Sequence, residues 1–323
     1  MVKIDIISGF LGAGKTTLIK KLLKDGFQGE QVVLIENEFG EIGIDGGFLK
    51  EAGIQIREMN SGCICCSLVG DFGTSLKEVV TKYDPDRILI EPSGVGKLSD
   101  VIKAVQGVQD EVDIKLNSYT TVVDAKKCKM YMKNFGEFFD NQIQYAGVII
   151  MSRTDIASEK KVQESLELLR SLNKDAAIIT TPIENLDGKK LVEVMEHPVS
   201  LEQEMLEEEH EHHHHHDGEC GCGHDHHHHH ADEVFTSWGR ETIKKYTREG
   251  LEKILEALSE SDKYGIILRA KGMLPAEDGT WIYFDMVPEE TEIREGAPEY
   301  TGRLCVIGSK LDEHALEELF GIA

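Results

Sequence analysis

Nine residues near the start of the chain, GFLGAGKTT at positions 9–17, have types and a spacing that suit phosphate chemistry. Gly9, Gly14, Lys15 and Thr16 occupy the fixed positions of the pattern G-x-x-x-x-G-K-[ST]. Glycines let the backbone curl so that its N–H groups face phosphate oxygens, Lys15 brings a cation to the β and γ phosphates, and Thr16 offers a hydroxyl to Mg²⁺. We therefore predict a nucleotide site made by Gly9, Gly12, Ala13, Gly14, Lys15, Thr16 and Thr17. The alternative is a glycine-rich turn, but a strand-like run precedes the motif and a helix-like run follows it, as the motif requires.

A second acid is needed near the metal of such a site, and the apolar run DRILIE ends in Glu91. Gly94 follows three residues later, so E-x-x-G stands where phosphate-loop enzymes have a metal-linked acid and a glycine that senses the γ phosphate. We predict that Glu91 acts with Lys15 and Thr16 in catalysis by holding a metal-bound or attacking water. Taken alone, a glutamate that closes a strand is a common structural feature.

Base recognition is expected near the end of a later strand, where AGVIIMSRTDIAS puts Asp155 four residues past Met151. A carboxylate there accepts hydrogen bonds from the N1–H and exocyclic amine of guanine, which adenine cannot supply. Taken alone, Asp155 suits a helix N-cap or a solvated charge equally well.

Three cysteines, Cys63, Cys65 and Cys66, lie between the phosphate motif and Glu91. Three thiolates nearly complete a tetrahedral set of soft ligands, and a carboxylate from the nearby ENEFGE is a candidate fourth ligand. Among Glu36, Glu38 and Glu41 we favour Glu41. The set suits Zn²⁺, with Cu(I) or Co²⁺ open on softness alone, and the alternative is that these are buried structural cysteines.

A second metal-binding feature is the segment LEEEHEHHHHHDGECGCGHDHHHHHAD, which has twelve histidines between 210 and 230. Neutral imidazoles at this density suit loose capture of Zn²⁺ or Ni²⁺. An expression tag is the obvious alternative, but tags sit at termini and this tract is internal, split and interleaved with acids. The predicted ligands are His212, His213, His214, His215, His216, Cys220, Cys222, His224, His226, His227, His228, His229 and His230.

The elements that must position these residues alternate along the first 200 residues. Short apolar runs (VKIDIIS, QVVLIEN, DRILIE, TTVVDA, AGVIIMS and AAIITT) are separated by amphipathic stretches, which predicts an α/β domain with a parallel sheet covered on both faces. We expect this phosphate-loop domain to span residues 1–200 and the acidic, histidine-rich linker to span 201–232. Closely spaced strands with few helices then predict a smaller α+β domain over 233–323.

Composition limits the classes of partner and the cellular location. The net charge of −24 argues against nucleic acid, because a phosphate-binding surface needs clustered Lys and Arg. No apolar run approaches the roughly 20 residues of a membrane span, and the start MVKIDIISGF lacks a secretory leader. We expect a cytoplasmic protein without a membrane partner. Its seven cysteines, an odd number, are then ligands or core residues and not disulfides.

Together, GFLGAGKTTL, ENEFG at 36–40, GCICC at 62–66, EPSG at 91–94 and VVDA at 122–125 resemble the CobW-type GTPases. The resemblance continues in VFTSWG at 234–239 and RLCVIGSKLD at 303–312, so it covers essentially the whole chain. It implies a metal-linked GTPase, related to HypB and UreG, that couples GTP binding to metal transfer. The family's guanine motif is N-K-x-D, whereas this chain has Ser152-Arg153-Thr154-Asp155. Because Arg153 can stack on a purine and Asp155 remains, we expect guanine preference to persist.

The resulting hypothesis is a slow GTP-hydrolysing metallochaperone that uses GTP, Mg²⁺ and Zn²⁺, with Co²⁺ or Ni²⁺ as alternative metals. The histidine-rich segment would collect metal, the C-x-C-C site would hold it, and the nucleotide state would control its transfer to an unidentified client apo-metalloprotein. Two other classes remain open at this point, a metal store with a vestigial nucleotide site and a small-molecule kinase. A nucleotide-dependent homodimer is also left open.

Overall fold

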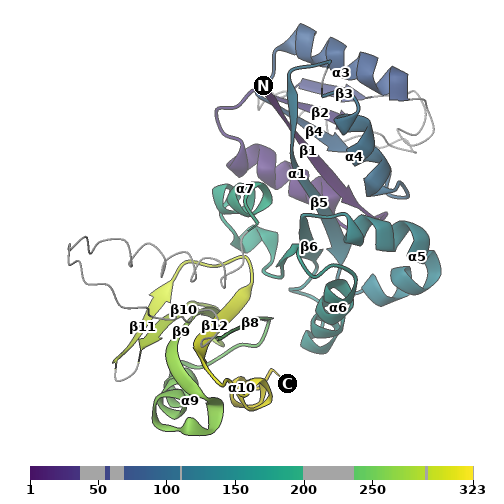
Figure 1. Cartoon of the computed structure of the whole chain (residues 1–323). Coiled ribbons are helices and arrows are strands. Elements are labelled where there is room, and N and C mark those ends of the chain that lie inside the picture. The colour runs from purple at the N-terminus through teal and green to yellow at the C-terminus, as the bar shows by residue number, and fades with distance from the viewer. Residues whose placement is uncertain (37–54, 59–68, 110, 199–235, 288–289, 323) are drawn as a thin grey trace, which may run out of the picture. The chain divides into compact units, whose positions relative to one another are not determined.

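The computed structural model describes residues 1–36, 55–58, 69–109, 111–198, 236–287 and 290–322 (Figure 1). These residues belong to two compact units, Met1–Pro198 and Val199–Ala323, which are described separately below.

Unit 1 is built on a seven-stranded, fully parallel sheet with the strand order β3-β2-β4-β1-β5-β6-β7. Its central strands are nearly continuous runs of Val, Ile and Leu because both faces of the sheet are covered by helices. The strands are β1 (Val2–Gly9), β2 (Val32–Glu36), β3 (Gln55–Glu58), β4 (Arg87–Glu91), β5 (Ile114–Asp124), β6 (Val148–Ser152) and β7 (Ala177–Ile179).

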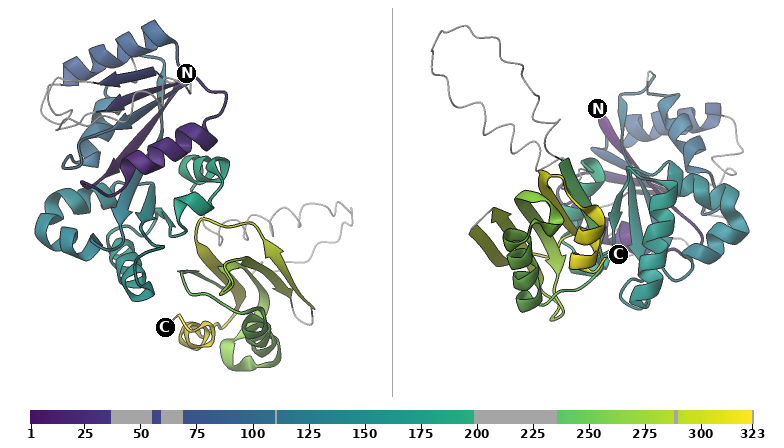
Figure 2. Two further views of the ribbon diagram at one scale, coloured as in Figure 1. Left: turned by 180° about the vertical axis from the view of Figure 1, so that it is seen from behind. Right: turned by 60° about the horizontal axis from the view of Figure 1, so that its bottom comes forward.

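The helices of unit 1 form two layers (Figures 1 and 2). In one layer, α1 (Lys15–Lys21) continues into the π-helical turn η1 (Leu22–Gly26), and α7 (Gly188–Glu196) packs against η1. The other layer is a row in which each helix contacts the next: α3 (Val69–Tyr83), α4 (Leu98–Gln106), α5 (Cys128–Gln144) and α6 (Glu159–Leu172). A short 3₁₀ turn, η2 (Ile183–Asn185), follows β7. The predicted parallel sheet with helices on both faces is confirmed.

The strands end at one common edge, which we call the carboxyl edge. Three predicted site residues lie there: Gly9 ends β1, Glu36 ends β2 and Glu91 ends β4. Asp124 and Ser152 end the neighbouring strands β5 and β6. The chain order reverses across β1, since β4 lies on one side of it and β5 on the other. In open parallel sheets, ligands bind at the carboxyl ends of strands beside such a reversal.

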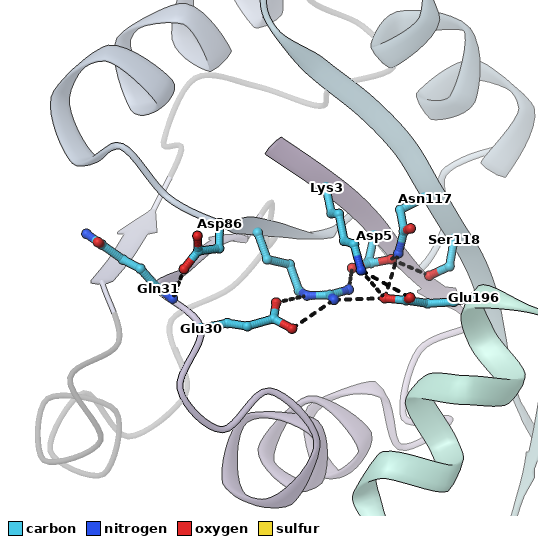
Figure 3. Close-up of polar contacts among 9 residues, drawn as sticks. Lys3, Asp5, Glu30, Gln31, Asp86, Asn117, Ser118 and Glu196 are labelled. Atoms are coloured by element: carbon cyan, nitrogen blue, oxygen red, sulfur yellow. Dashed lines mark hydrogen bonds and ion pairs between the residues drawn. The ribbon is translucent and has the colours of Figure 1, made fainter. Parts of the chain in front are cut away.

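At the opposite edge, which we call the amino edge, a buried polar network joins the sheet to α7 (Figure 3). Arg87 is 1% exposed and forms ion pairs with Asp5, Glu30 and Glu196. The network is completed by Lys3, which donates to Glu196, and by Asn117 and Ser118, which both donate to Asp5. It therefore fastens the last residue of α7 to β1, β4 and β5.

The described residues of unit 2 form a five-stranded antiparallel sheet with the order β11-β10-β9-β12-β8 and two helices. Its core includes Trp238, Leu255, Phe284 and Phe320. The predicted small α+β domain is confirmed. Its elements are β8 (Thr236–Thr242), α9 (Arg248–Glu260), the 3₁₀ turn η4 (Asp262–Tyr264), β9 (Ile266–Pro275), β10 (Trp281–Val287), β11 (Glu290–Gly296), β12 (Gly302–Ser309) and α10 (Glu313–Phe320).

Two strands, β3 and β11, are not among those expected from the apolar runs, and each is an edge strand of its sheet. In the described residues of both units, no helix is both long enough and apolar enough to cross a membrane.

Candidate nucleotide-binding site

The predicted phosphate-binding loop connects β1 to α1, and its glycines occupy backbone conformations that other residues avoid. Gly9 has φ 144°, and a Cβ there would lie 2.5 Å from the carbonyl oxygen of Val122 on β5. Gly12 has φ 68°, and Gly14, directly before α1, has φ 108°. Because L side chains are strained at positive φ, the loop requires glycine at these places.

Lys15 is buried at the start of α1, with 8% of its surface exposed. Its Nζ donates to the carbonyl oxygens of Gly9 at 2.9 Å and Phe10 at 3.4 Å, and lies 3.8 Å from Oε1 of Glu91. Glu91 is likewise buried, with 7% exposed. The loop thus holds an ammonium group against its own backbone and beside a carboxylate, whereas the adjacent Thr16 and Thr17 are exposed.

The segment that follows Glu91 lies directly against the phosphate-binding loop. A Cβ at Gly94 would lie 2.9 Å from Cδ2 of Leu11 and 3.0 Å from its backbone nitrogen. Any larger residue at position 94 would push the two loops apart. The structure therefore brings together Lys15, Glu91 and Gly94, which the sequence predicted as parts of one site.

On the other side of the phosphate-binding loop is a pocket of about 230 Å³. Its walls include Ala13, Gly14, Thr17, Arg153 and Asp155, all of which were predicted to bind nucleotide. Among the lining residues that were not predicted are Pro182, Ile183 and Glu184, which follow β7. Their position past the end of a parallel strand is the sequence signal that points to them.

Ser152 and Arg153 connect the end of β6 to the phosphate-binding loop. The Ser152 hydroxyl donates to the carbonyl oxygen of Ala13 at 2.5 Å. The guanidinium of Arg153 donates to the carbonyl oxygen of Gly12 at 3.0 Å and forms an ion pair with the buried Asp124. Arg153 has φ 60°, an uncommon value for a residue other than glycine. Both side chains thus bind the loop's backbone, an arrangement that the spacing of SRTD alone does not reveal.

One predicted metal ligand, Glu36, lies within the described residues. Glu36, the last residue of β2, pairs in register with Glu91 on β4 and with Glu58 on β3. In the described ranges, no group of three or more His, Cys, Asp or Glu is arranged to hold a metal ion. The remaining predicted ligands lie outside these ranges: Glu41, Cys63, Cys65, Cys66, His212, His213, His214, His215, His216, Cys220, Cys222, His224, His226, His227, His228, His229 and His230.

Two other cysteines are core residues, as their sequence context suggests. Cys128 and Cys305 are both buried and free. Burial raises the pKa of Cys128 to about 11, so its thiol stays protonated and is a poor metal ligand near neutral pH.

Comparison with known families agrees with this geometry. Residues 3–180, more than half of the chain, match the model of the CobW/HypB/UreG nucleotide-binding domain. The chain belongs to the CobW/HypB/UreG family. Residues 235–322 match the C-terminal domain of the cobalamin synthesis protein cobW. The predicted resemblance to CobW-type proteins is therefore confirmed for both domains.

Several curated members of this family are similar to the chain. The zinc chaperone YeiR of Escherichia coli is 29% identical over 191 residues, which is 59% of this chain and 58% of YeiR. The zinc chaperone YjiA of the same organism is 30% identical over 194 residues, which is 58% of this chain and 59% of YjiA. These two matches thus cover under two thirds of each relative. The zinc-regulated GTPase metalloprotein activator 1 of Schizosaccharomyces pombe is 24% identical over 90% of this chain and 76% of that protein.

Among solved structures of the family, Zn(II)-bound YjiA GTPase from E. coli aligns with 99% of this chain and 98% of that chain. The sequence identity is 21% and the TM-score is 0.44.

Proposed function

We propose that this protein is a GTP-hydrolysing metallochaperone in which the nucleotide state controls the holding and release of Zn²⁺. The observation that carries the proposal is the adjacency of two strand ends at the carboxyl edge. Glu91, beside Lys15, is in register with Glu36, from which the chain continues toward Glu41. A change at the γ-phosphate position therefore occurs next to the start of a predicted metal-binding segment.

The phosphate side of the site fits a nucleotide with Mg²⁺. The Thr16 hydroxyl and the Glu91 carboxylate are hard oxygen donors of the kind that Mg²⁺ prefers, and Thr16 is exposed at the loop. Bound Mg²⁺ would neutralise charge on the β and γ phosphates. Lys15 would exchange its contacts with the Gly9 and Phe10 carbonyls for phosphate oxygens, and Glu91 would orient the attacking water. Hydrolysis without an arginine finger or a partner is expected to be slow.

The pocket beside the loop supports guanine as the base. Asp155 lines this pocket and is exposed, so its carboxylate is accessible to the N1–H and amino group of guanine. Ser152 takes the place of the motif's usual asparagine and still donates to the loop at Ala13. This contact supports the view that the altered motif retains a working nucleotide site.

Zinc is the proposed cargo because relatives of this chain are named zinc chaperones and a zinc-regulated GTPase metalloprotein activator. Cys63, Cys65 and Cys66, with Glu41 or Glu36, are the proposed holding site, and the histidine-rich segment is the proposed collector. If nucleotide and metal each bias the same segments, the affinity of each changes with the other by the same factor. The proposal includes transfer of the metal to a client apo-metalloprotein and a nucleotide-dependent homodimer.

The test is the Zn²⁺ affinity of the protein, measured by competition with a chelator in the presence of Mg²⁺ and either GDP or a non-hydrolysable GTP analogue. A variant lacking residues 207–231 is measured in parallel to remove the weak histidine sites. We expect a change of about tenfold or more between nucleotides, equivalent to about 1.4 kcal/mol of coupling.

The matched control is Cys65→Ala, in which this nucleotide dependence should disappear. Equal Zn²⁺ affinities with both nucleotides would reject the chaperone in favour of a metal store. A product analysis that finds a phosphorylated acceptor in place of free phosphate would reject hydrolysis.

A further inference from the structure

Gln142, near the end of α5, is a fully buried polar residue whose role neither the motifs nor the family match assigns. It is 0% exposed, and its Nε2 donates to the carbonyl oxygens of Gly94 at 3.1 Å and Gly96 at 2.8 Å. These carbonyls belong to the loop that follows Glu91. A single side chain thus holds two peptide groups of the loop predicted to sense the γ phosphate.

The chemistry of the contact determines the orientation of the amide. Both facing groups are carbonyls, which only accept hydrogen bonds, so the NH₂ end of Gln142 must point toward them. The Oε1 atom is then buried, and among the described residues it has no hydrogen-bond partner. Leaving this acceptor unsatisfied is costly. An apolar side chain would spare that cost, but it would remove the donors to the carbonyls of Gly94 and Gly96. The amide is therefore explained by its contacts with the loop.

Gln142 is itself anchored to the sheet beside the phosphate-binding loop. The Thr121 hydroxyl on β5 donates to the backbone carbonyl of Gln142 at 2.7 Å. Thr121 pairs in register with Ser8, one residue before Gly9. The neighbouring Asn141 contacts the first turn of α4, where it accepts from the backbone N–H of Ser99. The helix that holds the loop is thereby fixed to β5 and to α4.

The preceding turns of α5 support the phosphate-binding loop. Phe10 packs its ring against Tyr131 with centroids 4.5 Å apart, against Phe135 at 5.1 Å and against Phe139 at 6.2 Å. The helix is kinked at Phe135, which has the non-helical values φ −137° and ψ 29°. One helix therefore contacts both loops of the candidate site, through Phe10 in one and through Gly94 and Gly96 in the other.

We propose that Gln142 is a positioning residue. It holds the loop at Gly94 and Gly96, here called the Gly94 loop, in place against the phosphate-binding loop, so that triphosphate recognition and hydrolysis depend on the Gln142 amide. Gln142 has no exposed surface, and it therefore acts through the backbone of Gly94 and Gly96. This inference rests on the proposed nucleotide function. The Gln142 contacts should affect GTP more than GDP, because the Gly94 loop is the one predicted to sense the γ phosphate, whereas a diphosphate is held by the phosphate-binding loop alone.

The test uses the full-length Gln142→Met variant, which keeps nearly the same volume and removes both donors. We expect kcat for GTP hydrolysis to fall by about 10- to 100-fold, the size of effect that follows from misplacing a group near the reacting atoms. The affinity for GDP should stay within about threefold of the wild type, whereas the preference for a non-hydrolysable GTP analogue over GDP should fall. The control is Lys133→Gln, which changes an exposed side chain on the same helix and should leave kcat unchanged.

A second variant, Gln142→Glu, gives a chemical readout that a packing role would not produce. A buried carboxylate facing two carbonyls has a raised pKa, and its neutral form regains one O–H donor. Its kcat relative to wild type at the same pH should therefore increase as the pH is lowered from about 8 to about 6. The Met variant should show no such recovery.

Two results would overturn the inference. One is an unchanged kcat and nucleotide preference in Gln142→Met. The other is an equal loss of GDP and GTP-analogue binding with a lowered melting temperature and no pH recovery in Gln142→Glu, because this combination is the signature of packing alone. Failure of the proposed function is distinct, since in that case the wild-type protein itself would not release phosphate from GTP.

Discussion

The two edges of the parallel sheet in unit 1 both bury charged side chains, but they hold them differently. At the amino edge, Arg87 forms ion pairs with three carboxylates, and Asn117 and Ser118 complete the hydrogen bonds of Asp5. At the carboxyl edge, Lys15 is 3.8 Å from Glu91 and donates to carbonyl groups of its own loop. The contacts at the amino edge join strands and a helix to one another, whereas those at the carboxyl edge join the start of α1 to the backbone of a loop.

This difference indicates separate roles for similar buried charges. A buried ion pair is stable only when its geometry and additional hydrogen bonds compensate for lost hydration. The amino edge meets this condition with side chains from β1, β4, β5 and α7, and it holds the last residue of α7. The carboxyl edge leaves its cation on backbone oxygens that a phosphate group can replace. Substitutions at the amino edge should therefore mainly lower stability, and those at the carboxyl edge should mainly lower activity.

The largest expected effect is on stability, from Arg87→Met. The substitution leaves Asp5 and Glu196 without their shared cation, and breaking a buried pair in this way costs about 3–5 kcal/mol. Chemical denaturation measured by far-UV circular dichroism should show this loss, while GTP hydrolysis well below the unfolding transition stays near the wild-type rate. The control is Lys77→Met, which removes an exposed pair with Glu111 and should leave the unfolding midpoint unchanged. If Arg87→Met lowers kcat without lowering stability, the amino edge is not a purely structural region.

The next effect is on catalysis, from Lys15→Met. Removing a preorganised donor at the developing charge typically costs about 10²–10³-fold in rate, so kcat for phosphate release should fall by that factor. The melting temperature should fall less than in Arg87→Met, because Lys15 lies 3.8 Å from one carboxylate, that of Glu91, whereas Arg87 forms ion pairs with three. Lys20→Met on the same helix is the matched control, for which unchanged kcat is expected. Equal rates for Lys15→Met and wild type would exclude the phosphate-binding loop as the site of hydrolysis.

These two edges also show which parts of the fold the sequence could predict. Strands β1, β2, β4, β6 and β7 are apolar runs because both faces are covered, and the sequence identifies them readily. The edge strands β3, with the sequence QIRE, and β11, with ETEIREG, each contain a single isoleucine. Hydrophobic patterns do not reveal these two polar strands, whereas β7, also an edge strand, is apolar and is identified.

The candidate site divides in the same way. Short local motifs at strand ends contain Gly9, Lys15, Glu91 and Gly94. That these residues lie close together could be predicted, because the carboxyl ends of parallel strands meet at one edge of the sheet. The contacts of Ser152, Arg153 and Gln142 with loop carbonyls join segments 46 to 141 residues apart. No local sequence pattern predicts contacts between residues so far apart in the chain, because these contacts form only when helices and strands pack together. The predicted metal ligands other than Glu36 lie outside the described residues, and all the metal-ligand assignments remain predictions.

A third prediction concerns acid stability and Glu196. Burial alone would raise the pKa of this carboxyl, but hydrogen bonds from Arg87, Lys3 and Asn117 outweigh burial and lower the pKa to about 2 from 4.5. The resulting stabilisation, about 3 kcal/mol, is present above pH 4.5 and is lost as the pH falls from 4.5 toward 2.

The measurement is the free energy of unfolding against pH for wild type and Glu196→Gln. Glutamine cannot take up a proton at this site as the pH falls, so the stability of the variant should fall less steeply with acid over that range. Parallel curves would mean that Glu196 is not coupled to Arg87 in solution.

The smallest effect is expected from Ser152 at the carboxyl edge. Ser152→Ala removes one neutral hydrogen bond to the carbonyl of Ala13, which is worth about 0.5–1.5 kcal/mol, so GDP affinity should fall by about two- to tenfold. Ser152→Asn keeps a donor and restores the usual residue of the guanine motif, so it should bind GDP at least as well as Ser152→Ala. Ser171→Ala is the matched control, because Ser171 also donates to a backbone carbonyl but is exposed on α6. If Ser152→Ala binds GDP as tightly as Ser171→Ala, then Arg153 alone, through Asp124 and Gly12, suffices to hold the loop.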